Sequence, residues 1–356
     1  MEETNCNLCG ADDTVLMYTE RDRWLGLPGS FRLVRCQQCG LAYLNPRPAL
    51  EDMAFYYPAT YGPHRAVPED EASLLSYLNH TCKYGKRTAV IRSARPQGGR
   101  LLDIGCATGS FLHVMGQSGS WEVCGVEPNA DAAHCARDRF GLDVFEGTLK
   151  NALFSDAYFD VVTMWEVIEH LHDPRSTLLE IHRILKPEGM LVVSTPNLSS
   201  WDATFFGRHW MGLDAPRHLY VFSPRALRQL LRRTGFECQR TRSVVGLYYS
   251  VRRSAQFWLD EHARSGKTKK LLLAILSSRF SRAIAYPYLA LSNLAGRAGD
   301  MTMIGTKVAT TQTDSAGHPR ASLLGSETEA IGTQGTGKES AGHLAPNGTW
   351  RTVRPT

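Results

Sequence analysis

Apolar runs alternate with amphipathic stretches throughout residues 100–245, and polar or glycine-containing segments separate them. Continuous apolar runs predict buried strands, whereas apolar positions spaced by three and four residues predict helices. Strands are expected at 101–103, 121–126, 142–145, 159–164 and 190–194, and helices at 110–115, 129–137 and 178–185. This alternation of strand and helix is typical of an α/β fold with a parallel sheet.

The flanking residues extend this pattern on both sides. Helices are expected at 53–57, 73–93, 225–234, 269–276 and 283–294, and strands at 236–245 and 301–308. The upstream helices make a helical collar over 46–97, and the downstream apolar helices make an insertion over 247–299. Thr, Gly, Ser, Ala and Pro dominate residues 310–356, which predicts a disordered tail because such a segment buries too little apolar surface.

Composition adds few constraints. The chain of 356 residues suits one large domain with a small one, and its formal net charge of +5 permits an anionic substrate without requiring one. Five of the nine cysteines are scattered, which favours a reducing compartment, and we expect a cytoplasmic protein. The first residues lack the apolar core of a signal peptide, and no run of about 18 apolar residues predicts a membrane span.

A tight glycine turn follows the first strand of the α/β region. Asp103 ends the strand, and Gly105-Cys106-Ala107-Thr108-Gly109 leads into the next helix. Glycines allow a sharp turn and a close approach of the backbone to a ligand. The spacing differs from the Gly-x-Gly-x-x-Gly of dinucleotide sites, and a carboxylate would repel phosphate but suit a cationic ligand. A generic Rossmann turn is the alternative interpretation.

This segment resembles the first motif of class I S-adenosylmethionine-dependent methyltransferases, acid-x-Gly-x-Gly-x-Gly, with Ala107 in place of the middle glycine. The resemblance implies S-adenosylmethionine as the cofactor and a Rossmann-like, mostly parallel sheet of seven strands with an antiparallel last strand, within a domain over 98–309. We expect the cofactor to be bound by Asp103, Gly105, Cys106, Ala107, Gly109, Glu127, Pro128, Thr148 and Trp165.

The reasons for these assignments differ. Glu127 ends the second strand about twenty residues past the turn, where a carboxylate can accept hydrogen bonds from both ribose hydroxyls. Thr148 stands where related enzymes often have an acid that holds the adenine, so a backbone N–H is the alternative there. Cys106 is expected to be a small packing residue and not a nucleophile.

A second block follows the fourth predicted strand. Glu166, Glu169 and His170 are spaced i, i+3 and i+4, so a helical turn would place them on one face. The pattern resembles that of ubiquinone-pathway O-methyltransferases, which implies a divalent cation near the acceptor. We favour a simpler interpretation, in which Glu166 lines the cofactor pocket and the other two hold a loop, because Mg²⁺ usually takes more oxygen ligands.

The loop over 198–222 follows the fifth strand, so we expect it to form a lid over the acceptor. It is rich in Trp, His and Arg, which suit an aromatic or anionic substrate. Its Arg-His-Leu-Tyr before a Phe-Ser-Pro helix start matches the family pattern. His218 is the first candidate for a base or an acceptor-orienting group, beside Glu166 and His170, and a structural histidine is the alternative.

Two Cys-x-x-Cys pairs, each followed by glycine, lie near the N-terminus. Cys6, Cys9, Cys36 and Cys39 offer the four thiolates of a structural zinc site, which predicts a zinc ribbon over 1–45. A redox pair is the alternative, and the matching glycines fit it poorly. The segment CGLAYLNPRP resembles the junction in zinc-ribbon-bearing methyltransferases of bacterial gene clusters.

Together these features predict a methyltransferase for a small molecule such as a sugar, a phenol or quinone, or a polyketide-like acceptor. An RNA-modifying enzyme is the second hypothesis, supported by the ribbon and by Arg225, Arg228, Arg232, Arg233, Arg240 and Arg242. A protein that binds the cofactor without catalysis is the third. The helices in 269–294 would suit the surface of a membrane, but we expect them to pack on the domain or in a homodimer.

Overall fold

A seven-stranded sheet forms the centre of the fold, in the order β10-β11-β8-β7-β4-β5-β6. Its strands are β4 (Gly99–Ile104), β5 (Trp121–Glu127), β6 (Asp143–Glu146), β7 (Phe159–Trp165), β8 (Leu185–Pro196), β10 (Phe236–Arg242) and β11 (Asp300–Lys307). The strands from β8 to β6 pair in parallel, whereas β11 is antiparallel to both β8 and β10. The predicted mostly parallel sheet with an antiparallel last strand is confirmed.

This computed structural model describes residues 1–58, 74–244, 247–263 and 265–308. The tail predicted to be disordered, 310–356, lies outside the described residues, and so does the middle of the predicted collar, 59–73. The described residues 1–308 belong to one compact unit.

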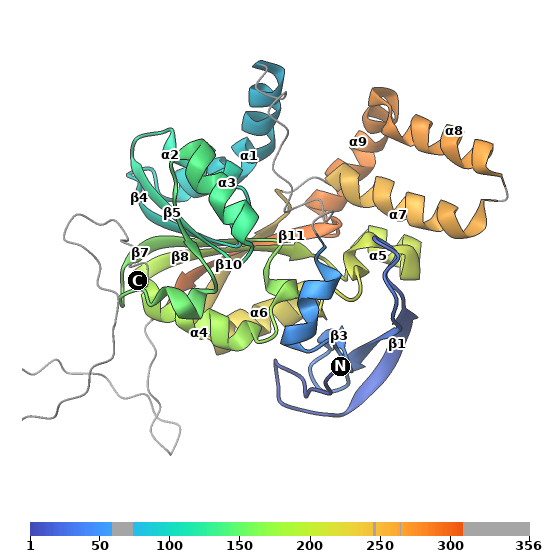
Figure 1. Cartoon of the computed structure of the whole chain (residues 1–356), viewed down its shortest axis with the longest axis horizontal. Helices are drawn as coiled ribbons and strands as arrows, with labels where there is room; N and C mark the ends of the chain where they lie inside the picture. Colours follow the sequence, from blue (N-terminus) through green and yellow to red (C-terminus); the bar gives the residue numbers. More distant parts are fainter. Residues whose placement is uncertain (59–73, 245–246, 264, 309–356) are drawn as a thin grey trace, which may run out of the picture. The chain divides into compact units, whose positions relative to one another are not determined.

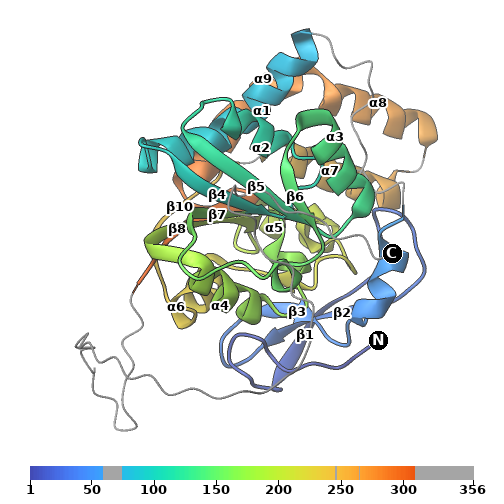
Figure 2. The same cartoon turned by 60° about the vertical axis from the view of Figure 1, so that its left-hand side comes forward.

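Helices cover both faces of the sheet, as Figures 1 and 2 show. The helices α1 (Leu74–Ala94), α2 (Ser110–Gly116) and α3 (Ala130–Phe140) lie on one face, and α4 (Pro174–Ile184) and α6 (Pro224–Arg233) lie on the other. Residues of the central strands are therefore buried on both sides, which is why β7 and β8 appear in the sequence as continuous apolar runs.

Side-chain caps set where these helices begin. The Asn129 side chain accepts a hydrogen bond from the N–H of Ala132 at the start of α3, and the Ser223 side chain does the same for Ala226 in α6. Helix α4 begins four residues before the predicted start because Asp173 caps it and Pro174 occupies its first turn.

A second, smaller sheet has the order β1-β2-β3-β9. Its strands are β1 (Thr14–Glu20), β2 (Phe31–Cys36), β3 (Ala42–Leu44) and β9 (Tyr220–Val221). A short 3₁₀ helix, η1 (Leu50–Tyr56), follows it. The fourth strand thus comes from the segment 198–222, far along the chain from the other three, and pairs antiparallel with β3.

The segment 198–222 differs from the predicted loop. It contains α5 (Trp201–Phe206) and the 3₁₀ turns η6 (Gly207–His209) and η7 (Met211–Leu213) before it enters β9. The pattern of the segment did not indicate β9 because a two-residue strand depends on its partner, and that partner is β3.

Three helices occupy the insertion between β10 and β11. They are α7 (Leu247–His262), α8 (Gly266–Ser277) and α9 (Arg279–Leu294), and they extend to one side of the central sheet in Figure 1. The sequence predicted α8 and α9 but not α7. Among the described residues, no helix combines the length and the apolar character needed to cross a bilayer.

Candidate functional site

Two acidic side chains lie at the ends of neighbouring strands. β4 and β5 pair in parallel with Asp103 opposite Gly125, so Asp103 and Glu127 come to the same edge of the sheet. Each is only 3% exposed. Thr163 donates a hydrogen bond of 2.6 Å to Asp103, and the carboxylate of Glu127 accepts one of 2.8 Å from the N–H of Ala107. The structure thus brings together the two acids that the sequence predicted to hold the cofactor.

The surroundings of these acids favour a cationic ligand. Burial raises the pKa of Asp103 to about 7, although the Thr163 hydroxyl and the positive charge of Arg87 oppose the shift. Burial also raises the pKa of Glu127, against hydrogen bonds from the N–H groups of Asn129 and Ala107. A bound cation would offset the cost of holding two carboxylates out of water.

The predicted turn connects β4 to α2 through left-handed backbone. Gly105, Ala107 and Gly109 have φ angles of 69°, 47° and 77°. Cys106 is buried between them, and a Cβ added to Gly125 would lie 2.5 Å from the Cys106 sulfur. Burial raises the pKa of Cys106 well above its usual range, so this thiol stays protonated and serves as packing.

The structure gives less support for the cofactor contacts predicted for Pro128, Thr148 and Trp165. Pro128 and Thr148 are exposed, and the Thr148 hydroxyl donates to the side chain of Asn151. Trp165 is largely buried and packs edge to face on Phe111, with 5.5 Å between the ring centroids. Their contacts with a cofactor stay predictions.

Two charged residues near this site were missed in the sequence. Arg87 of α1 places its guanidinium 4.7 Å from the centre of the Trp165 ring, and its charge lowers the pKa values of Asp103 and Glu166. Asp300 is the first residue of β11. Burial raises the pKa of Asp300 well above its usual range, and the nearby carboxylate of Glu166 adds to this shift. Neither residue has a local motif, because both reach the site only through the fold.

Glu166 directly follows β7 and has an unusual backbone conformation. Its φ is 60°, its N–H donates to the carbonyl of Ser194, and its carboxylate accepts a hydrogen bond of 2.7 Å from the Ser194 hydroxyl. Burial raises the pKa of Glu166, and Arg87 and His218 oppose the shift. The turn that follows, η5 (Ile168–His170), carries Glu169 and His170, and Glu166 is close enough for its charge to raise the pKa of Glu169.

Glu169, His170 and His218 form a compact cluster of their own. One ligand atom from each lies within 4.8 Å of the others. The Nδ1–H of His218 donates to the carbonyl of Gly212 (2.9 Å), and the Nδ1–H of His170 donates to the carbonyl of Arg217 (3.0 Å). The carbonyl of Gly212 sets the tautomer of His218, so its Nε2 keeps its lone pair, whereas the Nδ1 of His170 also lies 2.8 Å from the Tyr57 hydroxyl.

This cluster fits a divalent cation. Glu169 is 1% exposed, and among the described residues neither of its carboxylate oxygens accepts a well-formed hydrogen bond, although the Thr195 hydroxyl is near enough to lower its pKa. Burial and the nearby Glu166 raise the pKa of Glu169 well above its usual range. A buried carboxylate beside two imidazoles suits Zn²⁺, Mn²⁺ or Fe²⁺ better than Mg²⁺. The grouping differs from the predicted one, since His218 takes the place of Glu166.

The four N-terminal cysteines also converge. The Cys6 and Cys39 sulfurs are 3.4 Å apart, the Cys9 and Cys36 sulfurs are 3.5 Å apart, and all four lie within 4.8 Å of one another. A tetrahedral zinc site with Zn–S bonds of about 2.3 Å places its sulfurs roughly 3.8 Å apart. This donor set fits a structural zinc ion.

Hydrogen bonds link the small sheet to the histidine cluster. The N–H of Leu44 in β3 donates to the carbonyl of Leu219, and the N–H of Leu219 donates to the carbonyl of Glu169. Arg217, fully buried, binds the carboxylate of Asp22 at 2.6 Å and that of Asp214 at 2.7 Å. His218 therefore lies between two residues that are tied to the N-terminal sheet.

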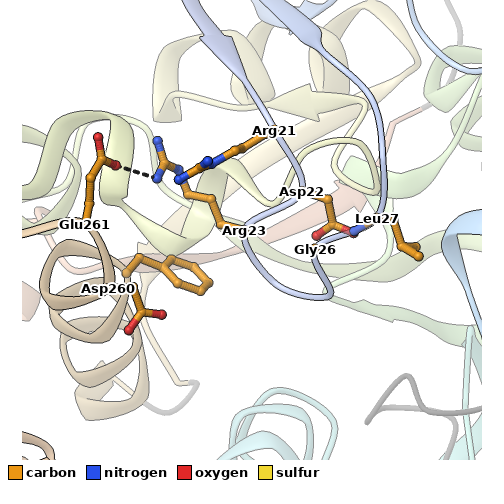
Figure 3. Close-up of a pocket in the computed structure, with 8 residues that line it drawn as sticks. Arg21, Asp22, Arg23, Gly26, Leu27, Asp260 and Glu261 are labelled. Atoms are coloured by element: carbon orange, nitrogen blue, oxygen red, sulfur yellow. Dashed lines mark hydrogen bonds and ion pairs between the residues drawn. The ribbon is translucent and has the colours of Figure 1, made fainter. Parts of the chain in front are cut away.

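A separate cavity of about 280 Å³ lies between the β1–β2 connection and α7 (Figure 3). Arg23 reaches across to Glu261, with 2.9 Å between the charged atoms. None of the residues that the sequence analysis selected lines this cavity. It is distinct from the edge of the sheet that carries Asp103 and Glu127.

The arginines that suggested RNA binding do not all form a solvated face. Arg233 donates a hydrogen bond of 2.5 Å to the carbonyl of Leu8, so it links α6 to the first cysteine pair. The side chains of Arg240 and Arg242 lie outside the described part of the chain.

Comparison with known proteins shows what the region around this site is similar to. Residues 76–241 match the family model described as a methyltransferase domain. The ubiquinone biosynthesis O-methyltransferase of Maricaulis maris is 32% identical over 166 residues, 43% of this chain and 64% of that protein. The protein of that name from Ruegeria pomeroyi is 36% identical over 155 residues, 40% of this chain and 62% of that protein. The chain thus spans less than two thirds of the length of these relatives.

The solved structures that align with the chain share little sequence with it. A crystal structure from Thermotoga maritima, described as an S-adenosylmethionine-dependent methyltransferase and possible histamine N-methyltransferase, aligns with a TM-score of 0.42 at 22% identity. The alignment covers 65% of this chain and 93% of that one. Residues 76–241 are therefore similar to methyltransferase domains, both in the family model and in the two curated relatives.

Proposed function

We propose that the protein transfers a methyl group from S-adenosylmethionine to a small-molecule acceptor. The observation that carries this proposal is the pair of buried acids at adjacent strand ends, Asp103 and Glu127, beside a turn of left-handed backbone. Glu127 would accept hydrogen bonds from both ribose hydroxyls, since each carboxylate oxygen has lone pairs beyond those used by the backbone. Asp103 would attract the cationic methionyl end, and Arg87 would bind its carboxylate.

The chain's main contribution to the reaction is alignment. Methyl transfer from a sulfonium is an in-line displacement without a covalent enzyme intermediate, so the protein positions the acceptor and excludes water. A base is needed only for an acceptor that loses a proton. When the Glu169, His170 and His218 cluster holds no cation, the Nε2 of His218 is the best-placed base, because its Nδ1 proton is committed to Gly212. Glu166 and His170 complete the set of candidate catalytic residues.

We propose two metal sites with different roles. Cys6, Cys9, Cys36 and Cys39 would hold a structural zinc ion that stabilises the small sheet. Glu169, His170 and His218 would hold a divalent cation, which acts as a Lewis acid on an acceptor oxygen when bound. In that case the buried Glu169 carboxylate supplies the negative charge, and the backbone carbonyls of Gly212 and Arg217 hold the two rings in place.

The names of the curated relatives favour an oxygen acceptor of the phenol or quinone type, with a sugar or a polyketide-like molecule as alternatives. No observation in the described part of the structure favours RNA as the acceptor. The cytoplasmic location stays a prediction.

Titration calorimetry with S-adenosylhomocysteine tests the cofactor site. Glu127→Ala should weaken binding by about 10- to 100-fold, the loss expected for charge-assisted hydrogen bonds. Glu122→Ala removes the same kind of side chain from an exposed position on the same strand and should bind like the wild type. Wild-type affinity in a folded Glu127→Ala variant would contradict the proposed site.

A further inference from the structure

Helices α8 and α9 expose large apolar side chains on regular stripes. Phe280, Ile284, Pro287, Leu291 and Leu294 follow the spacing i, i+4, i+7, i+11 and i+14, which places them along one side of α9. Phe280 is 73% exposed and Leu294 is 86% exposed. The stripe therefore runs the length of the helix without cover from the described residues of this chain.

The preceding helix repeats this feature. Leu271, Leu272 and Ile275 are exposed and share one side of α8, in which no residue is buried. The hairpin is nevertheless held in place, because the Tyr248 hydroxyl of α7 donates to the carbonyl of Leu276 at 2.6 Å. We expected these helices to pack on the domain, but the apolar side chains on their outer faces are exposed.

The charge of this segment is one-sided. Residues 262–299 contain seven Lys and Arg residues and no Asp or Glu, whereas the rest of the chain has 33 basic and 35 acidic residues. The segment alone therefore accounts for the positive net charge of the protein. Lys267 and Lys270 lie in α8 beside the exposed leucines, and Arg282 lies in α9.

We propose that α8 and α9 dock on the surface of an anionic membrane. Apolar stripes flanked by basic residues, in helices that do not span a bilayer, are the features of helices that lie at the lipid–water interface. Each basic residue near an anionic surface contributes about 1 kcal/mol, and the apolar side chains add affinity by leaving water. A second copy of the chain would cover the apolar stripes but would bring two positively charged segments together, since only Lys269 of the seven basic residues has an ion pair in the described part of the chain.

Flotation of the full-length protein with lipid vesicles tests this proposal. Vesicles of phosphatidylcholine with about 30% phosphatidylglycerol should carry most of the protein upward, and vesicles of phosphatidylcholine alone should carry little. Added salt of about 0.5 M should reduce the bound fraction severalfold because it screens the charges. The readout is binding and not turnover, so it is independent of the proposed methyl transfer.

Substitutions on the stripe separate the possible occupants. The double variant Ile284→Asp/Leu291→Asp should reduce binding to the anionic vesicles at least tenfold. Leu179→Asp makes the same kind of change at an exposed position on α4 and should leave binding unchanged. Equal binding by the double variant and the wild type would overturn the proposal. So would a wild-type dimer that ignores the vesicles and becomes monomeric in the double variant, since a second copy would then be the occupant.

Discussion

At the scale of single residues, Ala107 has a side chain at a backbone position that favours glycine, in the turn between β4 and α2. Its φ of 47° lies in the left-handed region, where a residue with a Cβ is less stable than glycine by about 1 kcal/mol. The family motif has glycine at this position. Alanine in place of glycine at position 107 is therefore expected to cost stability, and this cost can be measured.

Ala107→Gly should raise the free energy of unfolding by up to about 1 kcal/mol, because glycine adopts this backbone without strain. Urea denaturation of the cofactor-free protein measures the change. Ala89→Gly is the matched control: Ala89 is an exposed residue of α1, where glycine should lower stability by about 0.5–1 kcal/mol. A loss of stability in both variants would contradict the strain argument.

We expect Asp103 to make cofactor binding depend on pH. Its pKa is about 7 in the fold and about 3.9 in an unfolded chain, so the folded protein binds the extra proton between these values. Stability therefore falls as the pH rises from about 4 to about 7, and a cationic ligand that favours the carboxylate reverses this effect.

Affinity for S-adenosylmethionine should rise about tenfold between pH 6 and pH 8, as Asp103 becomes ionised. Calorimetry at both values measures the change, and Asp103→Asn should weaken binding and abolish this pH dependence. A wild-type affinity that is the same at pH 6 and pH 8 would show that Asp103 does not meet a positive charge.

At the scale of elements, prediction from the sequence succeeded where the signal is local. Apolar runs and cap residues such as Ser223 mark elements whose patterns are complete within a short segment. Strand β9 has two residues and no pattern of its own, because it exists only through pairing with β3. Arg87 and Asp300 were missed for the same reason, since distant parts of the chain bring them to the site.

The short segment 214–219, just before β9, makes the contacts that join the two sheets. Its backbone holds Glu169 through the N–H of Leu219, and its side chains place Arg217 on Asp22. Hydrogen bonds thus join the predicted zinc ribbon, residues 1–45, to the predicted lid, residues 198–222. This link was not evident from the sequence, in which the two segments are separate.

At the scale of the whole molecule, this arrangement couples the cysteine cluster to the histidine cluster. Cys36→Ser should remove bound zinc and lower the rate of methyl transfer about tenfold or more, because β3 would no longer hold the segment that carries His218. Cofactor affinity should change little, since Asp103 and Glu127 belong to β4 and β5.

Elemental analysis, turnover and calorimetry on one preparation check these three outcomes together. Cys135→Ser is the control, because Cys135 is a free, half-buried thiol of α3 outside the cluster. Full turnover by zinc-free Cys36→Ser protein would show that the small sheet holds its shape without the metal and that the coupling is absent.

The late arrival of β9 has a consequence for how the protein is made. Chains emerge from the ribosome from the N-terminus, and early segments often fold before later ones are synthesised. Here one edge of β3 pairs with Tyr220 and Val221 of β9. The N-terminal sheet therefore lacks its fourth strand until most of the catalytic domain has been translated. We therefore expect the cysteine-containing N-terminal sheet to complete its folding late in synthesis, although its cysteines are among the first residues to appear.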